Sequence, residues 1–241
     1  MKATALMCTY GRHSFLERSV RMFLEQDYED KHLVIFQNSP VFQTLDQEYP
    51  NITLVNQTGF DTVGDVFEEA IKYIPSDTDL VFIWDDDDIY FKNHISNGVA
   101  GILKYNKPAY KPMYALLKER QGLSRTSNTL EATWALRKEV LYHTGFSKYN
   151  FSDSHKAWVD YCNNNNLVYV DEKSPITFCY IWDDPEHLIV HTSAIEEKSN
   201  SRQIHHRFSA DHGDRVITPC SKEMVDSLFV EMNAFLEMQK S

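Results

Sequence analysis

The chain has 241 residues, of which 42% are hydrophobic and 13% aromatic, a composition that supports a folded core and excludes intrinsic disorder. Its formal net charge of −11 at pH 7 argues against a surface built as a whole to bind nucleic acid or anionic membrane. No stretch approaches about 18 apolar residues, so no membrane span is expected, and the first apolar run is too short for a signal peptide. The cysteines, at 8, 162, 179 and 220, form no C-x-x-C pair, which predicts reduced thiols, no zinc site and a cytoplasmic location.

Apolar runs of strand length alternate with helical patterns through the first hundred residues. Strands are predicted at 3–8, 32–36, 51–55 and 80–84, and helices at 14–24, 62–74 and 91–105. Such alternation is typical of βαβ units. It predicts an α/β fold, Rossmann-like, with a mixed, mostly parallel central sheet flanked by helices.

The remaining chain continues with strands and helices but shows no repeat and no linker. Strands are predicted at 130–136, 167–170 and 176–182, and helices at 137–143, 153–162 and 221–238. We therefore expect one domain over residues 1–241.

Four consecutive aspartates, Asp85 to Asp88, follow the apolar run Leu80 to Trp84. A run of this kind is typical of a strand buried on both faces, and ligands of open α/β sheets bind at the carboxyl ends of such strands. Each ionised pair costs on the order of 3 kcal/mol at about 6 Å and an effective dielectric of about 20. A hard divalent cation, Mn²⁺ or Mg²⁺, would relieve this repulsion. A solvated acidic turn or a helix cap is the alternative, and Tyr90 stands where an EF-hand needs glycine.

Positive charge gathers in one segment of this acidic chain, from Lys104 to Arg125, with tyrosines between the basic residues. One interpretation is a pair of solvated strands with ordinary surface lysines. The other is a site for an anionic acceptor, including DNA.

The order of motifs resembles a family 2-like glycosyltransferase of the GT-A fold over roughly residues 3–182. Met7-Cys8-Thr9-Tyr10-Gly11-Arg12 is similar to the family's opening strand and Pro-Thr-Tyr-Asn-Arg loop, and Trp84-Asp85-Asp86-Asp87-Asp88 to its D-x-D metal motif. Ala132 to Phe146 resembles the segment that carries Arg-Arg and Gly-Gly-Phe, and Ser152-Asp153 falls at its Glu-Asp motif. Gly11, Gln37, Phe67-Glu68 and Ser152 depart from the family pattern.

The resemblance implies a role for each of these positions. Asp87 and Asp88 would bind Mn²⁺ or Mg²⁺, with His191 or His187 of the polar tail as a further ligand. Asp153 would be the general base of an inverting transfer; a helix N-cap is the alternative for this residue. The expected nucleotide-sugar pocket consists of Thr9, Tyr10, Arg12, Gln37, Asn38, Asp85 and Asp86. Tyr10 would stack on the base or serve a purely structural role.

The implied reaction moves a hexose or pentose from a nucleotide diphosphate sugar, with UDP-sugar as the expected donor, to an acceptor hydroxyl. Residues 1–100 would form the nucleotide-sugar half and residues 101–241 the acceptor half with its C-terminal helix. The acceptor would be a glycan or, as the second choice, a hydroxylated DNA base that must be flipped out of the duplex. The alternatives are a phosphatase of the haloacid dehalogenase type, which also has D-x-D after a strand, and a non-catalytic sugar-nucleotide binder.

Overall fold

The computed structural model describes residues 1–119, 122–127, 130–147, 154–184, 189–190, 218–219, 230, 232 and 234. In these residues a central sheet of seven strands has the order β10-β6-β9-β4-β1-β2-β3. The strands are β1 (Ala3–Thr9), β2 (Lys31–Gln37), β3 (Ile52–Asn56), β4 (Leu80–Ile83), β6 (Ala109–Pro112), β9 (Ala135–Arg137) and β10 (Val168–Asp171). Four neighbouring pairs are parallel, and β9 runs antiparallel to both β4 and β6. The predicted α/β class with a mixed, mostly parallel sheet is confirmed.

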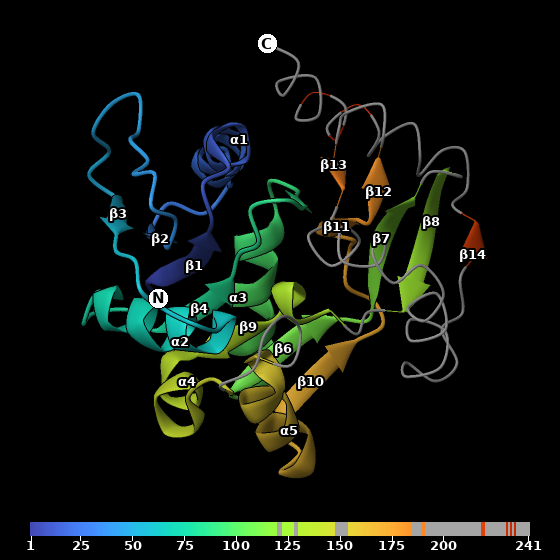
Figure 1. The fold of residues 1–241 in the computed structure, drawn as a ribbon. Helices are drawn as coiled ribbons and strands as arrows, with labels where there is room; N and C mark the ends of the chain where they lie inside the picture. The colour runs from blue at the N-terminus through green and yellow to red at the C-terminus, as the bar shows by residue number, and fades with distance from the viewer. Residues whose placement is uncertain are drawn as a thin grey trace.

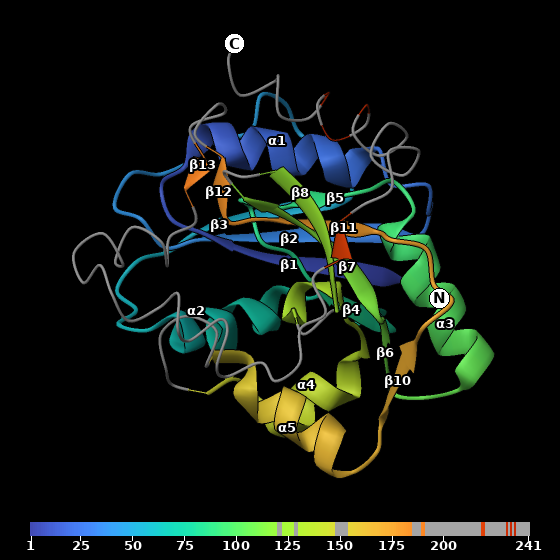
Figure 2. The same ribbon diagram turned by 90° about the vertical axis from the view of Figure 1, so that its right-hand side faces the viewer.

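Helices cover both faces of this sheet (Figure 2). On one face lie α1 (His13–Leu24) and α3 (His94–Tyr105); on the other lie α2 (Val63–Ala70), followed by the 3-10 turn η1 (Ile71–Tyr73), α4 (Lys138–Thr144) and α5 (Lys156–Asn164). Successive residues of a strand point to opposite faces. In β4, Phe82 therefore packs in the core with α1 and α3, whereas Val81 and Ile83 pack in the core with α2, α4 and α5. Burial on both faces explains the unbroken apolar run before the aspartates.

A second sheet lies beside the central one (Figure 1), and the acidic loop connects the two. Its order is β14-β8-β7-β11-β5. The strands are β14 (Thr218–Pro219), β8 (Gly122–Ser127), β7 (Tyr114–Glu119), β11 (Phe178–Ile181) and β5 (Ile89–Tyr90); β12 (Asp183–Asp184) and β13 (Ile189–Val190) form a separate pair. Because β4 ends at Ile83 and β5 begins at Ile89, the four aspartates lie where the chain passes from one sheet to the other.

Two glycines let α3 lie directly on the sheet. A Cβ at Gly101 would come 2.3 Å from the ring of Tyr110, and one at Gly98 would come 2.5 Å from the ring of Phe82. Such distances are far inside van der Waals contact, so no larger residue fits without displacing the helix. This contact joins the first hundred residues to β6. The second part of the chain thus completes the central sheet with β6, β9 and β10.

Several predicted boundaries differ from the structure. Helix α3 begins at His94 and not at 91, because Gln26 takes the backbone groups there: its amide donates to the Phe91 carbonyl and accepts from the Ile95 N–H. Residues 130–136 are not one strand, since the 3-10 turn η2 (Glu131–Thr133) precedes β9. Most of the predicted helix at 221–238 lies outside the described residues, but Met232 is helical and its Sδ lies 3.8 Å from Cys179 Sγ.

Among the described helices none combines the length and the apolar character needed to cross a membrane. Cys8, Cys162 and Cys179 are free thiols, and Cys220 lies outside the described residues.

Candidate functional site

The carboxyl ends of three parallel strands meet at one edge of the central sheet. Thr9 at the end of β1 pairs with Gln37 at the end of β2, and the Trp84 N–H bonds to the Leu6 carbonyl at 3.0 Å. The acidic loop therefore lies beside the C-terminal residues of β1. Trp84 is fully buried and stacks on Tyr90 at 3.8 Å between ring centroids, which closes the loop at its base. The Tyr90 hydroxyl accepts a 2.7 Å hydrogen bond from the Asp85 N–H.

Asp86 holds the loop in place. Its carboxylate accepts a 2.5 Å hydrogen bond from Thr9 Oγ1 and a second bond from Arg12 Nη2. Its backbone carbonyl accepts from Arg18 Nη2 at 3.1 Å and from Ser19 Oγ at 3.2 Å. Burial raises the pKa of Asp86 to about 6, against the opposing effect of Arg12. Because both carboxylate oxygens already have protein partners, Asp86 is an organising residue of the site.

The four carboxylates of the loop outnumber the two guanidinium groups beside them, those of Arg12 and Arg18. Asp87 Oδ2 accepts from Arg12 Nη1 at 3.0 Å. Asp88 Oδ1 accepts from the Ile181 N–H of β11 at 2.9 Å, while its Oδ2 is buried without a hydrogen-bond partner. Burial together with Asp87 and Asp86 raises the pKa of Asp85 to about 8. The pKa of Asp88 is also well above its usual range because of burial and Asp87.

The two arginines of the site have different surroundings. Arg18 lies on α1 with 2% of its surface exposed, and burial lowers its pKa against the opposing charge of Asp87. Arg12 follows Gly11, whose φ of +66° favours glycine and whose position leaves no room for a Cβ beside Ser39. Burial disfavours the Arg12 charge as well, but Asp86 and Asp87 outweigh it and raise the pKa of Arg12.

The predicted nucleotide-contacting residues at the ends of β1 and β2 are adjacent, but they differ in exposure and in hydrogen bonding. Gln37 is buried, and its amide donates to the carbonyls of Ser39 and Val41, at 3.2 and 2.6 Å. Its side chain therefore shapes the loop after β2. Asn38 is half-buried, and its Oδ1 has no hydrogen-bond partner. Tyr10 is 61% exposed at the same edge, which leaves its ring accessible to a flat ligand.

Residues 4–157 match the sequence model of glycosyl transferase family 2. The chain belongs to glycosyl transferase family 2. It is therefore a glycosyltransferase, which excludes the haloacid dehalogenase alternative. No curated protein sequence shows a significant match to the chain.

Solved structures of S. aureus TarS share the fold of this family 2 glycosyltransferase. TarS residues 1–349 superpose with a TM-score of 0.59 at 16% identity, over 88% of this chain and 74% of that one. Its complex with UDP gives a TM-score of 0.60 over the same shares, and its complex with UDP-GlcNAc gives 0.58 over 76% and 59%. In a longer TarS structure the match covers 44% of that chain. The predicted GT-A architecture is confirmed.

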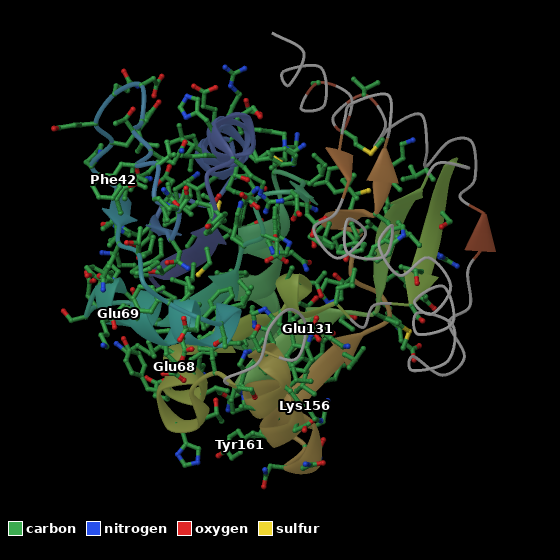
Figure 3. All side chains as sticks on the ribbon, in the orientation of Figure 1. Phe42, Glu68, Glu69, Glu131, Lys156 and Tyr161 are labelled. Carbon is green, nitrogen blue, oxygen red and sulfur yellow. The ribbon has the colours of Figure 1, made fainter. Side chains whose placement is uncertain are left out.

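Glu131 is a carboxylate of the glycosyltransferase that sequence reasoning did not identify. It lies in η2, between the elements of the two sheets (Figure 3), and is close enough to raise the pKa of Asp85. Lys111 of β6 lies 5.1 Å from the ring of Trp134; burial lowers its pKa to about 8, against the charge of Glu131. Neither residue belongs to a motif; Glu131 precedes β9, and the antiparallel pairing of β9 with β6 brings it close to Lys111.

Two predicted site residues, Asp153 and His191, lie outside the described residues, as does His187, so their roles stay predictions. In the part of the transferase that is described, no three histidine, cysteine, aspartate or glutamate side chains form a ready-made metal cage. The basic segment is spread over several elements. Lys107 bonds the Asn166 carbonyl, Arg125 lies 4.5 Å from the Tyr114 ring, and Lys111 is largely buried.

The raised carboxylate pKa values predict an unusual pH dependence of stability. A carboxyl whose pKa is higher in the folded than in the unfolded state stabilises the fold below its unfolded pKa, and this contribution is lost as pH rises. Asp85, whose pKa is about 8, should therefore lower the free energy of unfolding of the metal-free enzyme between about pH 6.5 and 7.5, by up to about 1.4 kcal/mol. Urea denaturation with a chelator present measures this.

The main titrations of the other shifted groups lie outside this pH window. Asp86, with a pKa of about 6, completes most of its change below the window. His94 and His155, whose pKa values burial lowers to about 3 and about 4, destabilise the fold mainly as pH falls below their unfolded pKa of about 6.5. Lys111 acts mainly above about pH 8. Asp85→Asn should flatten the slope. Stability that rises from pH 6.5 to 7.5 in the unmodified protein would contradict the prediction.

Proposed function

We propose that the enzyme transfers a sugar from a nucleotide diphosphate sugar, with a UDP-sugar as donor, to an acceptor hydroxyl. The observation that carries the proposal is the excess of buried carboxylates at the joined ends of β1, β2 and β4, where Asp88 Oδ2 lacks a partner. Ligands of open α/β sheets bind at this edge. The TarS structures with UDP and with UDP-GlcNAc motivate the choice of nucleotide.

The donor set fits a hard divalent cation, Mn²⁺ or Mg²⁺. The candidate ligands in the acidic loop are carboxylate oxygens, and such ions use one or two carboxylates plus substrate phosphates, so a cage of three protein ligands is not needed. In this proposal Asp87 and Asp88 hold the ion, Asp85 contacts it or the ribose, and His191 is a further ligand. When bound, the ion neutralises the charge that develops on the leaving diphosphate.

The protein residues supply positioning and proton transfer. Thr9 fixes the orientation of the acidic loop through its bond to Asp86, and Arg12 adds bonds to Asp86 and Asp87 before the ion binds. Tyr10 stacks on the base, and Asn38 offers its unpaired Oδ1. Asp153 accepts the proton of the acceptor hydroxyl as that oxygen attacks the anomeric carbon from the face opposite the diphosphate, which inverts the configuration. We propose a glycan acceptor, since the described basic residues of the Lys104–Arg125 segment lie on different elements, where Lys107 bonds Asn166 and Arg125 packs on Tyr114.

A thermal-shift panel of UDP-, GDP- and dTDP-sugars, each with and without Mn²⁺, tests the donor. A ligand at 100 times its Kd stabilises a protein by about 2.7 kcal/mol. We expect UDP-sugars with Mn²⁺ to raise Tm most. Equal shifts without Mn²⁺ would show that the donor binds without the metal. No shift with any of these nucleotide sugars would contradict the proposed class of donor. Release of UDP during incubation distinguishes an enzyme from a non-catalytic binder.

A further inference from the structure

One guanidinium group occupies the acidic edge that the proposed function assigns to a divalent cation. Arg12 bridges two carboxylates, with Nη2 on Asp86 Oδ1 and Nη1 on Asp87 Oδ2 at 3.0 Å. A carboxylate oxygen that ligates Mg²⁺ or Mn²⁺ lies about 2 Å from the ion. At that separation the same oxygen has little room for an arginine donor, and the two cations repel each other. Arg12 and a metal that bonds Oδ2 therefore compete for Asp87.

The two arginines differ in how easily their side chains can move away from the acidic loop. Arg18 is almost completely buried on α1 and bonds the Asp86 carbonyl, so its removal would open the core. The side chain of Arg12 is 25% exposed and precedes the first turn of α1. Its Nε has no hydrogen-bond partner, and the Phe15 ring lies 5.1 Å from its guanidinium carbon. Asp86 keeps its bonds to Thr9, Arg18 and Ser19 when Arg12 moves, so the loop retains its shape.

We propose that Arg12 is an internal counter-cation that holds Asp87 in the metal-free enzyme and leaves it when a divalent cation binds. The inference rests on the proposed function, because it takes Asp87 as the metal ligand. It has a consequence for the order of binding. Displacement of Arg12 weakens metal binding to the nucleotide-free protein, and a diphosphate, which supplies additional oxygen ligands and accepts bidentate arginine bonds, restores it. The ion and the nucleotide then bind together.

Mn²⁺ binding to the nucleotide-free protein, followed by electron paramagnetic resonance of the free ion, tests the exchange without any activity measurement. Arg12→Gln should tighten Mn²⁺ binding by about 10- to 100-fold, since hydrogen bonds of a charged pair contribute about 1.5–3 kcal/mol. Arg12→Lys keeps the charge but cannot bridge two carboxylates, and we expect a smaller increase. The lysine variant also tests the exchange if the glutamine variant does not fold.

Arg21→Gln is the matched control, because it removes the same charge from an exposed position of α1. It should leave Mn²⁺ affinity unchanged, and an equal increase in this variant would overturn the exchange in favour of a general charge effect. Unchanged or weaker binding by both Arg12 variants, with clear binding by the unmodified protein, overturns the inference alone. Absence of Mn²⁺ binding in every protein, with UDP present as well, overturns the metal part of the proposed function and the exchange with it.

Discussion

Asp87→Asn is expected to lower kcat/KM for sugar transfer by roughly 10²- to 10³-fold, a loss typical of removing one preorganised electrostatic contact to a transition state. The amide is nearly the same size but carries no negative charge, so it is a poor ligand for a hard cation. Folding should not suffer. Asp87 is one of four adjacent carboxylates, and its charge is the largest electrostatic contribution to the raised pKa of Asp85. The free energy of unfolding should stay the same or increase.

Asp77→Asn provides the matched control for this variant. The Asp77 side chain is 68% exposed and pairs with Lys2 at 3.0 Å on the surface. The same chemical change there should alter neither transfer nor stability measurably, because exposed ion pairs contribute about 0–1 kcal/mol. Steady-state kinetics with UDP release, together with urea denaturation, separates the two variants. Transfer by Asp87→Asn within a few-fold of the unmodified rate would show that Asp87 is not a metal ligand.

The central sheet and the location of the acidic loop could be predicted because local sequence determines both. A run of five apolar residues is compatible with a strand that has helices on both faces, and Phe82 and Val81 do enter opposite cores. The aspartates then fall at the carboxyl end of that strand through covalent connection alone. The order of the motifs indicated the family, and the match of residues 4–157 to its sequence model confirms that membership.

The individual roles of the site residues could not be predicted, because they depend on contacts between distant segments of the chain. The sequence predicts that Gln37 contacts the donor, whereas in the structure its amide donates hydrogen bonds to backbone carbonyls of the loop that follows β2. The two carboxylate oxygens of Asp86 accept hydrogen bonds from Thr9 and Arg12, which lie about 75 residues earlier in the chain. Arg18 and Glu131 reach the site from a helix and a 3-10 turn, without any motif. Composition and periodicity carry no information about such pairings.

Asp153→Asn is expected to reduce kcat by about 10²- to 10⁴-fold, the range for loss of a general base, while the Kd of the nucleotide stays the same. This substitution distinguishes the two roles open to Asp153. Asparagine caps a helix about as well as aspartate does, so a residue that only precedes α5 would tolerate the change. An amide cannot accept the acceptor's proton at neutral pH, so a catalytic base would not.

Asp160→Asn, on α5, removes an exposed carboxylate that pairs with Lys156, and it should leave transfer unchanged. Single-turnover kinetics with saturating donor, combined with nucleotide titration, measures chemistry and binding separately. If Asp153→Asn loses nucleotide affinity in proportion to its rate, the residue acts in donor binding. If it keeps full turnover but Asp153→Ala loses about 1 kcal/mol of stability, Asp153 is a cap, and another group must take the proton. Because the carboxylates Asp85 to Asp88 are already bonded to protein groups or assigned to the ion, that group would have to come from outside the acidic loop. Glu131, which lies close enough to Asp85 to raise its pKa, is the candidate among the described residues.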